Sequence, residues 1–198
     1  MDNYGITYFG IKMDWDLLSG FFSMHLVTWL LFLVMLTNYV RTSNVYAACS
    51  VKAERKEVLR LSAVVCCSYA LMMPIEYLVA FFDYYSHYFP YTVYFLLDIC
   101  TLFFINFFIK LKSTKAVLCK RYVTLCLSCN SVLFLLLQVD LLFMHNGLKP
   151  FEAWWFWDIF TIGVNFFDAV MILVLLIHKD LLKLNRFLLN RKRVKPVL

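Results

Sequence analysis

The sequence predicts an all-α polytopic membrane protein: a five-helix transmembrane bundle with its N-terminus outside, its C-terminus cytoplasmic and a basic amphipathic C-terminal helix. Three observations support this fold class. Hydrophobic residues make up 63% of the 198 residues, a share too large to be hidden in the core of a water-soluble domain of this size. The apolar residues fall into five long runs separated by charged segments. The basic residues are concentrated in alternate segments between these runs.

Each of the five apolar runs is long enough to cross a bilayer as a helix. A transmembrane helix needs about 20 mostly apolar residues to cross about 30 Å of hydrocarbon. We therefore expect membrane spans at residues 21–40, 61–82, 91–109, 122–144 and 155–178. The segment before the second span has helix-forming composition, so this helix is expected to begin near Tyr46, ahead of the membrane.

The positions of Lys and Arg indicate the orientation of the chain. Cytoplasmic loops of membrane proteins retain positive charge, because it is translocated reluctantly. Here 17 of the 19 basic residues follow the first, third and fifth spans, and only Lys12 and Lys149 do not. Aromatic residues typical of the membrane interface, including Trp154, Trp155 and Trp157, gather on the opposite side. The N-terminus is therefore expected outside and the C-terminus in the cytoplasm.

The chain is expected to form one transmembrane domain, residues 1–178, followed by a basic cytoplasmic tail, residues 179–198. In the tail, basic residues recur at helical spacing on one face and leucines lie on another, as is typical of an amphipathic helix. The basic residues expected to dock on a partner or on lipid are Lys179, Lys183, Arg186, Arg191, Lys192 and Arg193. The helix can rest on anionic lipid headgroups or bind a cytoplasmic protein, and both alternatives stay open.

Polar and acidic residues occur inside the expected spans, where each is energetically costly unless it is paired or hydrated. In the fifth span, Asp158, Thr161, Asn165 and Asp168 recur at helical spacing and form one narrow stripe. The candidate residues for an ion or proton pathway, or for helix association, are Glu76, Asp98, Asp140, Asp158, Asn165 and Asp168. No Lys or Arg lies within a span to neutralise the carboxylates among them.

Two other spans carry polar stripes with the same spacing. The stripe of the second span consists of Ser62, Cys66, Tyr69, Met73 and Glu76. The stripe of the fourth span consists of Thr124, Ser128, Ser131, Leu135 and Gln138. We expect these faces to meet protein or water rather than lipid.

The carboxyl groups within the spans allow two interpretations. One is an acidic vestibule, open to the outside, that concentrates cations or relays protons toward Asp168, the deepest carboxylate. The other is structural: the groups hydrogen-bond to one another, some of them protonated, and so fix how the helices pack within a bundle or between subunits.

Motifs for enzymatic chemistry are missing from the sequence. It contains no glycine-rich phosphate loop, no G-x-S-x-G and no H-E-x-x-H. The outer His and acidic residues follow no spacing known for metal ligands. We therefore expect a protein that is not an enzyme, with no catalytic residues, no cofactor, no metal and no direct binding of nucleic acid.

The chain is rich in Phe and Tyr and poor in Gly, a composition that resembles that of small membrane proteins encoded by mobile, AT-rich bacterial genes. This resemblance, in composition alone, implies phage defence or immunity and a bacterial inner membrane. The function expected from the sequence is a non-enzymatic membrane sensor or anchoring subunit that forms homo-oligomers and engages a cytoplasmic partner. The alternative is an ion-conducting pore or a proton-coupled membrane protein that uses the acidic vestibule.

Overall fold

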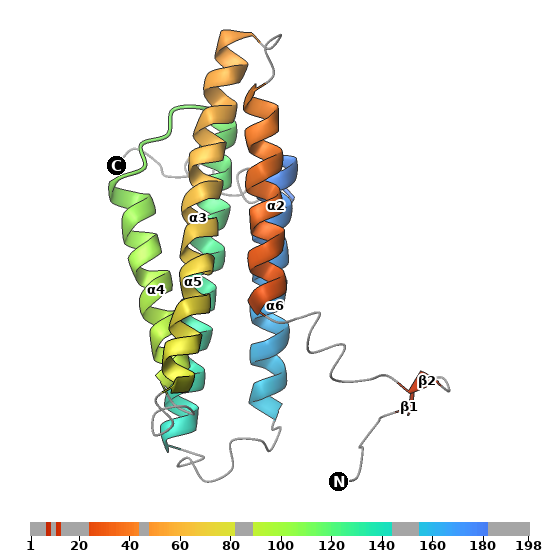
Figure 1. Cartoon of the computed structure of the whole chain (residues 1–198), viewed down its shortest axis with the longest axis vertical. Helices are drawn as coiled ribbons and strands as arrows, with labels where there is room; N and C mark the ends of the chain where they lie inside the picture. The colour runs from red at the N-terminus through yellow and green to blue at the C-terminus, as the bar shows by residue number, and fades with distance from the viewer. Residues whose placement is uncertain are drawn as a thin grey trace, which may run out of the picture.

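Five helices make up most of the described chain in the computed structural model. The structure describes residues 7–8, 11–12, 24–43, 48–81, 89–143 and 155–181. The helices are α2 (Met24–Ser43), α3 (Cys49–Phe81), α4 (Phe89–Phe107), α5 (Thr114–Phe143) and α6 (Trp155–Ile177). They stand side by side along the long axis of the molecule (Figure 1). The helical bundle predicted from the sequence is confirmed.

Two short strands near the N-terminus were not predicted. Strand β1 (Thr7–Tyr8) pairs with β2 (Ile11–Lys12) in an antiparallel manner, with Thr7 opposite Lys12. Strands of two residues are too short to produce the alternation of polar and apolar residues by which a strand is recognised in a sequence. They contribute little to the fold of the bundle.

Four of the helices are long and apolar enough to cross a membrane. The qualifying segments are Leu26–Ser43, Cys49–Ile75, Thr114–Leu142 and Trp155–Ile177. The apolar part of α4, Tyr91–Phe107, is shorter than these. The helix α4 ends at Phe107, two residues before the end of the third span expected at residues 91–109, and the chain turns at Phe108. This arrangement is consistent with a multi-pass membrane protein.

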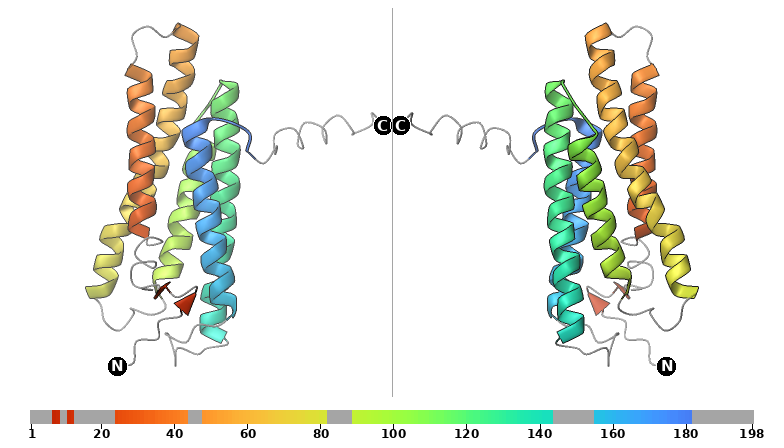
Figure 2. Two further views of the ribbon diagram at one scale, coloured as in Figure 1. Left: turned by 90° about the vertical axis from the view of Figure 1, so that its right-hand side faces the viewer. Right: turned by 90° about the vertical axis from the view of Figure 1, so that its left-hand side faces the viewer.

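The five helices pack in a closed ring. Each helix contacts the next helix along the chain, and α6 packs against α2. Figure 2 shows α2 and α3 on one side of the bundle and the other three helices on the opposite side. Large side chains from each part, such as Leu31, Leu61, Tyr122 and Met171, are fully buried between them. The core therefore lies along the axis of the bundle.

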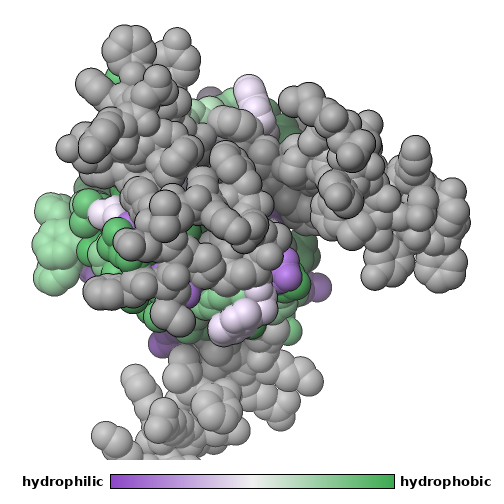
Figure 3. Space-filling model, turned by 90° about the horizontal axis from the view of Figure 1, so that it is seen from below, coloured by the Kyte–Doolittle hydropathy of each residue, from purple (hydrophilic) through white to green (hydrophobic). Residues whose placement is uncertain are grey.

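The outer surface of the bundle is largely apolar. Side chains such as Trp29, Phe107 and Ile162 are more than half exposed. In a view along the helices, hydrophobic residues show at the sides of the molecule (Figure 3). A surface of this kind is the one that lipid tails would cover.

Basic residues gather at one end of the bundle, which we call the basic end. There α2 and α6 end and α3 and α5 begin (Figure 1). The described Lys and Arg residues at this end are Arg41, Lys52, Arg55, Lys56, Arg60, Lys110, Lys112, Lys115, Lys120, Arg121 and Lys179. The fold thus brings together the described basic residues of the first two basic segments, with Lys179 from the start of the third.

Hydrogen bonds at the basic end join α2 to α3 and α6. The amide nitrogen of Asn38 donates to the hydroxyl of Ser62 at 3.0 Å and to the carbonyl oxygen of Leu175 at 3.1 Å. One turn later, the guanidinium of Arg41 donates to the carbonyl oxygen of Leu176 at 2.6 Å. The carbonyl groups in the last turn of a helix have no hydrogen-bond donors within that helix. For α6, side chains of α2 supply these donors.

Glu57 of α3 anchors the loop that leads into α5. Its carboxylate accepts hydrogen bonds from the backbone nitrogens of Lys112, at 3.1 Å, and Ser113, at 2.9 Å. It also accepts one from the hydroxyl of Ser113, at 2.7 Å. These donors immediately precede α5, where a negative charge also interacts favourably with the helix dipole.

Replacing Glu57 with alanine is expected to lower the free energy of unfolding by about 1–2 kcal/mol, because a partly exposed carboxylate that accepts several hydrogen bonds is lost. Thermal unfolding in mild detergent measures the change. The control is Glu54→Ala, which removes only the surface ion pair with Lys115 (2.8 Å). This pair contributes about 0–1 kcal/mol. Equal losses for the two variants would show that the Glu57 hydrogen bonds do not stabilise the loop.

Candidate functional site

Asp168 lies near the middle of α6 and receives hydrogen bonds from two other helices. Its side chain is 3% exposed. The Tyr69 hydroxyl of α3 donates to Oδ1 of Asp168 at 2.5 Å, and the amide nitrogen of Asn130, on α5, donates to the same atom at 2.8 Å. Both bonds end on Oδ1, so Oδ2 accepts neither of them.

The sequence of α6 explains why this carboxyl group is buried. Asp168 lies four residues after Val164 and three before Met171, and both of these residues are buried. Positions with this spacing share one face of a helix. Asp168 therefore occupies a core position on the apolar face of α6, where its neighbours hold it away from the membrane-facing surface.

A second buried carboxyl group, that of Asp98, comes from α4. Its side chain is 1% exposed, and neither carboxyl oxygen has a hydrogen-bond partner within the described part of the chain. It lies close enough to Asp168 for the two charges to interact. We call Asp98 and Asp168 the carboxyl pair. One turn after Asp98, the hydroxyls of Thr101 and Ser68 are hydrogen-bonded at 2.5 Å, which ties α4 to α3 beside the pair.

The charge of the carboxyl pair is not balanced by a cation from the described residues, none of which forms a salt bridge with Asp98 or Asp168. A buried carboxylate without a hydrogen bond or a counter-ion is strongly unfavourable, and two neighbouring negative charges repel each other. The buried side-chain oxygen of Asn130 also has no partner in the described chain. The carboxyl pair is therefore more favourable with a bound proton or cation than with both carboxyl groups ionised and nothing bound.

A cavity of about 270 Å³ reaches Asp168. Its described lining comes from four helices and consists of Val27, Tyr91, Tyr94, Phe134, Phe160, Thr161, Val164, Asn165 and Asp168. Most of these residues lie in the first turns of α4 and α6 or near the start of α2, in the half of the bundle away from the basic end. A cavity of this size holds several water molecules.

Aromatic rings form much of the cavity wall. The ring of Tyr91 makes edge contacts with Trp157 and Phe160, with centroids 6.2 and 5.9 Å apart. The ring of Tyr94 lies 5.4 Å from that of Phe134, which in turn contacts Phe160 at 5.5 Å. Such contacts hold the rings in fixed positions, so the cavity is framed by a rigid wall with two tyrosine hydroxyl groups.

The structure brings together only some of the predicted pathway residues. Asp98 and Asp168 form the carboxyl pair, and Asn165 lines the cavity, where its amide donates to the carbonyl oxygen of Thr161 at 2.7 Å. Asp158 is exposed and Asp140 is half-buried, and neither is part of the described cavity lining. Glu76 belongs to α3, but its side chain lies outside the described residues.

Asn130 was missed by the sequence analysis. The stripe expected on α5 contains Ser131, which is buried, and Leu135, which is 44% exposed. The face that meets Asp168 instead carries Cys126, Asn130 and Phe134, all of them buried. An Asn within an apolar helix was the available signal, because an amide group is costly in hydrocarbon without a partner.

Of the residues predicted to dock on a partner or on lipid, only Lys179 is within the described chain, where it is exposed. The others, Lys183, Arg186, Arg191, Lys192 and Arg193, lie outside the described residues. The amphipathic tail helix therefore remains a prediction.

Comparison with known proteins identifies no relative of this chain. It matches no protein-family model, no curated protein and no solved structure.

Proposed function

We propose that this chain is a proton-linked membrane protein in which the carboxyl pair takes up a proton through the cavity and passes it across the membrane. The observation that carries the proposal is the pairing of two almost fully buried carboxyl groups, from α4 and α6, beside a cavity that reaches Asp168. Ionisable groups buried in a membrane protein are typical of proton relays and ion pathways.

The geometry favours a proton over a metal ion. Hard metal cations bind about six or more oxygen ligands, whereas a proton needs only one acceptor atom. Within the described chain, no three His, Cys, Asp or Glu side chains are placed to hold a metal ion together. Asp98 has two carboxyl oxygens without a hydrogen bond, and Asp168 has Oδ2 outside the bonds to Tyr69 and Asn130.

In the proposed cycle, the carboxyl pair holds one proton, so that one group is neutral and the other is stabilised by Tyr69 and Asn130. Under a membrane potential the pair releases this proton toward the basic end, and water in the cavity supplies another one. Release leaves two negative charges that repel each other, which makes uptake of a new proton favourable. With the orientation predicted from the basic residues, the cavity belongs to the outer half of the bundle and exchanges protons with the outside.

This proposal is the alternative from the sequence analysis rather than its first choice. The sensor or anchoring function depends on a tail that lies almost entirely outside the described residues. The carboxyl pair, in contrast, is defined by burial, hydrogen bonds and a cavity. A homo-oligomer and a cytoplasmic partner are compatible with proton binding and stay predictions.

Proton flux into liposomes tests the proposal. The full chain is reconstituted with a pH-sensitive dye inside, and a membrane potential is imposed with potassium and valinomycin. We expect dye acidification with the wild-type chain and none with Asp168→Asn, which keeps the size and hydrogen-bonding ability of the side chain but cannot ionise. Asp158→Asn serves as the control, because it removes an exposed carboxylate from the same helix, and it should keep the flux. Wild-type flux equal to that of empty liposomes, or an active Asp168→Asn variant, would refute the proposal.

A further inference from the structure

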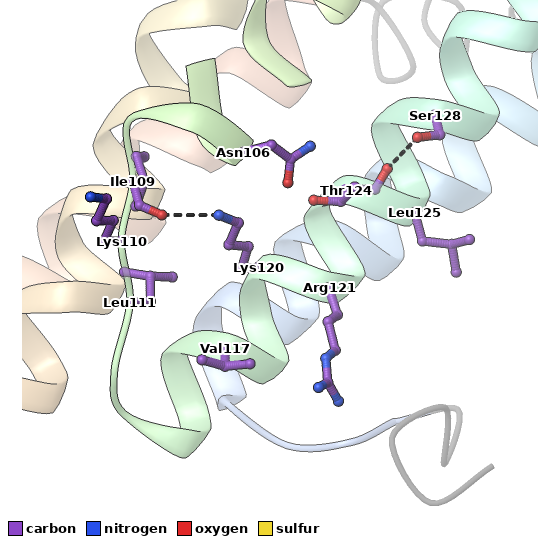
Figure 4. Close-up of a pocket in the computed structure, with 10 residues that line it drawn as sticks. All are labelled: Asn106, Ile109, Lys110, Leu111, Val117, Lys120, Arg121, Thr124, Leu125 and Ser128. Atoms are coloured by element: carbon purple, nitrogen blue, oxygen red, sulfur yellow. Dashed lines mark hydrogen bonds between the residues drawn. The ribbon is translucent and has the colours of Figure 1, made fainter. Parts of the chain in front are cut away.

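A second cavity, of about 720 Å³, lies at the basic end between the end of α4 and the first turns of α5. Its described lining consists of Asn106, Ile109, Lys110, Leu111, Val117, Lys120, Arg121, Thr124, Leu125 and Ser128 (Figure 4). We call it the basic cavity. It shares no residue with the carboxyl pair or with the cavity beside it. The proposed proton site does not use it.

Three basic residues line the basic cavity, and its described lining contains no Asp or Glu. Lys120 lies between the two helices, where its ammonium group donates to the carbonyl oxygens of Ile105 and Ile109 at 2.7 and 2.9 Å. An ammonium group has three hydrogens, so one is left for a further acceptor. Lys110 and Arg121 are exposed and complete the group of cations. The positive charge at this site favours an anion.

The cavity also has polar and apolar parts further along α5. Leu125 and Val117 supply apolar walls, and Ser128 lies about 10 Å beyond Arg121 along the helix. The hydroxyl oxygen of Thr124 is buried and has no hydrogen-bond partner within the described residues. At the end of α4, the rings of Phe107 and of Phe108 in the turn that follows are about two-thirds exposed. The site is therefore amphipathic, with cations at one end and hydrocarbon contacts beside them.

We propose that the basic cavity binds the headgroup of an anionic phospholipid. The phosphate is placed near Lys110, Lys120 and Arg121, and the hydroxyl of Thr124 donates to a phosphate or ester oxygen. The acyl chains continue past Leu125 and along the exposed phenylalanines of α4. Basic pockets between transmembrane helices are suited to such headgroups, because charge and hydrocarbon are satisfied together. A soluble phosphate would use the cations but leave the apolar walls without an occupant.

Native mass spectrometry of the full chain tests this site. The protein is purified from nanodiscs of equal parts phosphatidylglycerol and phosphatidylcholine, and the lipids that stay bound are measured. The double variant Lys110→Gln/Arg121→Gln removes two cavity charges and leaves the bonds from Lys120 to α4 in place. The control Lys52→Gln/Lys56→Gln removes the same charge from exposed positions on α3 at the same end. We expect the cavity variant to retain about tenfold less phosphatidylglycerol and the control to match the wild type.

Two further measurements distinguish a bound lipid from a soluble anion. Leu125→Trp fills the apolar part of the cavity and keeps every charge, so it should also reduce bound phosphatidylglycerol. Excess inorganic phosphate should not displace the lipid. Equal losses in the cavity variant and the surface control would overturn the proposal, since they would indicate a diffuse attraction to charge. Displacement by phosphate together with an unaffected Leu125→Trp variant would overturn it in favour of a soluble anion. Equal retention of the two lipids by the wild type would also refute it.

Discussion

Replacing Asp168 with leucine is expected to destabilise the bundle strongly, although it puts an apolar residue into an apolar core. The carboxylate is the acceptor for two buried donors, the hydroxyl of Tyr69 and the amide of Asn130. Leucine removes the acceptor and leaves both donors without a partner, at about 1–3 kcal/mol for each. The free energy of unfolding, measured by thermal or SDS unfolding of the purified chain, should therefore fall by about 2–6 kcal/mol.

A second substitution shows whether hydrogen-bond donors left without an acceptor cause this loss of stability. Tyr69→Phe removes one of the two donors, so it should destabilise the wild type but partly restore the Asp168→Leu variant. Asn165→Leu is the matched control one turn earlier on α6, because the Asn165 amide bonds only to a carbonyl of its own helix. It should change stability by less than about 1 kcal/mol. If Tyr69→Phe destabilises both backgrounds equally, the hydroxyl does not depend on Asp168.

Replacing Asp98 with leucine is expected to have the opposite effect on stability. The Asp98 carboxyl group is buried without a hydrogen bond to the described chain. Leucine removes this unsatisfied group and adds apolar packing, so the free energy of unfolding should rise by about 1–3 kcal/mol. Proton flux in liposomes should be lost in the same variant. A residue that lowers stability while supporting activity is typical of a functional site.

Thr101→Val is the matched control for Asp98→Leu, since it lies one turn further along α4. It removes the 2.5 Å hydrogen bond to Ser68 and should lower stability by about 1 kcal/mol. If Asp98→Leu lowers stability as well, the carboxyl pair holds the helices together. The structural interpretation of the intramembrane carboxyl groups would then be the better one.

Hydrophobic run length and charge predicted the bundle well, because both are set by local sequence. The position of each helix followed from the apolar runs, and the described basic residues lie together at one end. The end of α4 was placed two residues too late, since apolar residues continue to Ile109 although the helix ends at Phe107. Apolar composition fits a helix and a lipid-facing turn equally well, so it cannot mark where a helix stops.

The site was predicted only in part, and the reason lies in how polar side chains find partners. Asp168 stood out because a carboxylate in the middle of a membrane span needs a hydrogen-bond or charge partner. The face of α5 was harder to assign, because Ser128 and Ser131 donate to carbonyl oxygens of their own helix, at 2.7 and 2.9 Å. Such residues need no neighbour and give no information about which face is buried. Asn130 reaches another helix instead, and the pairing of Asp98 with Asp168 depends on helix rotations that the sequence pattern does not determine.

The bonds from Asn38 and Arg41 to the end of α6 also bear on how the protein is made. Among the helices of the described chain, α2 comes first and carries donors whose acceptors, the carbonyls of Leu175 and Leu176, belong to the last one, α6. During insertion, α2 therefore holds an amide and a guanidinium without their final partners until α6 has emerged. The ring of helices closes only at that point, so its completion reports that every helix of the bundle has been inserted.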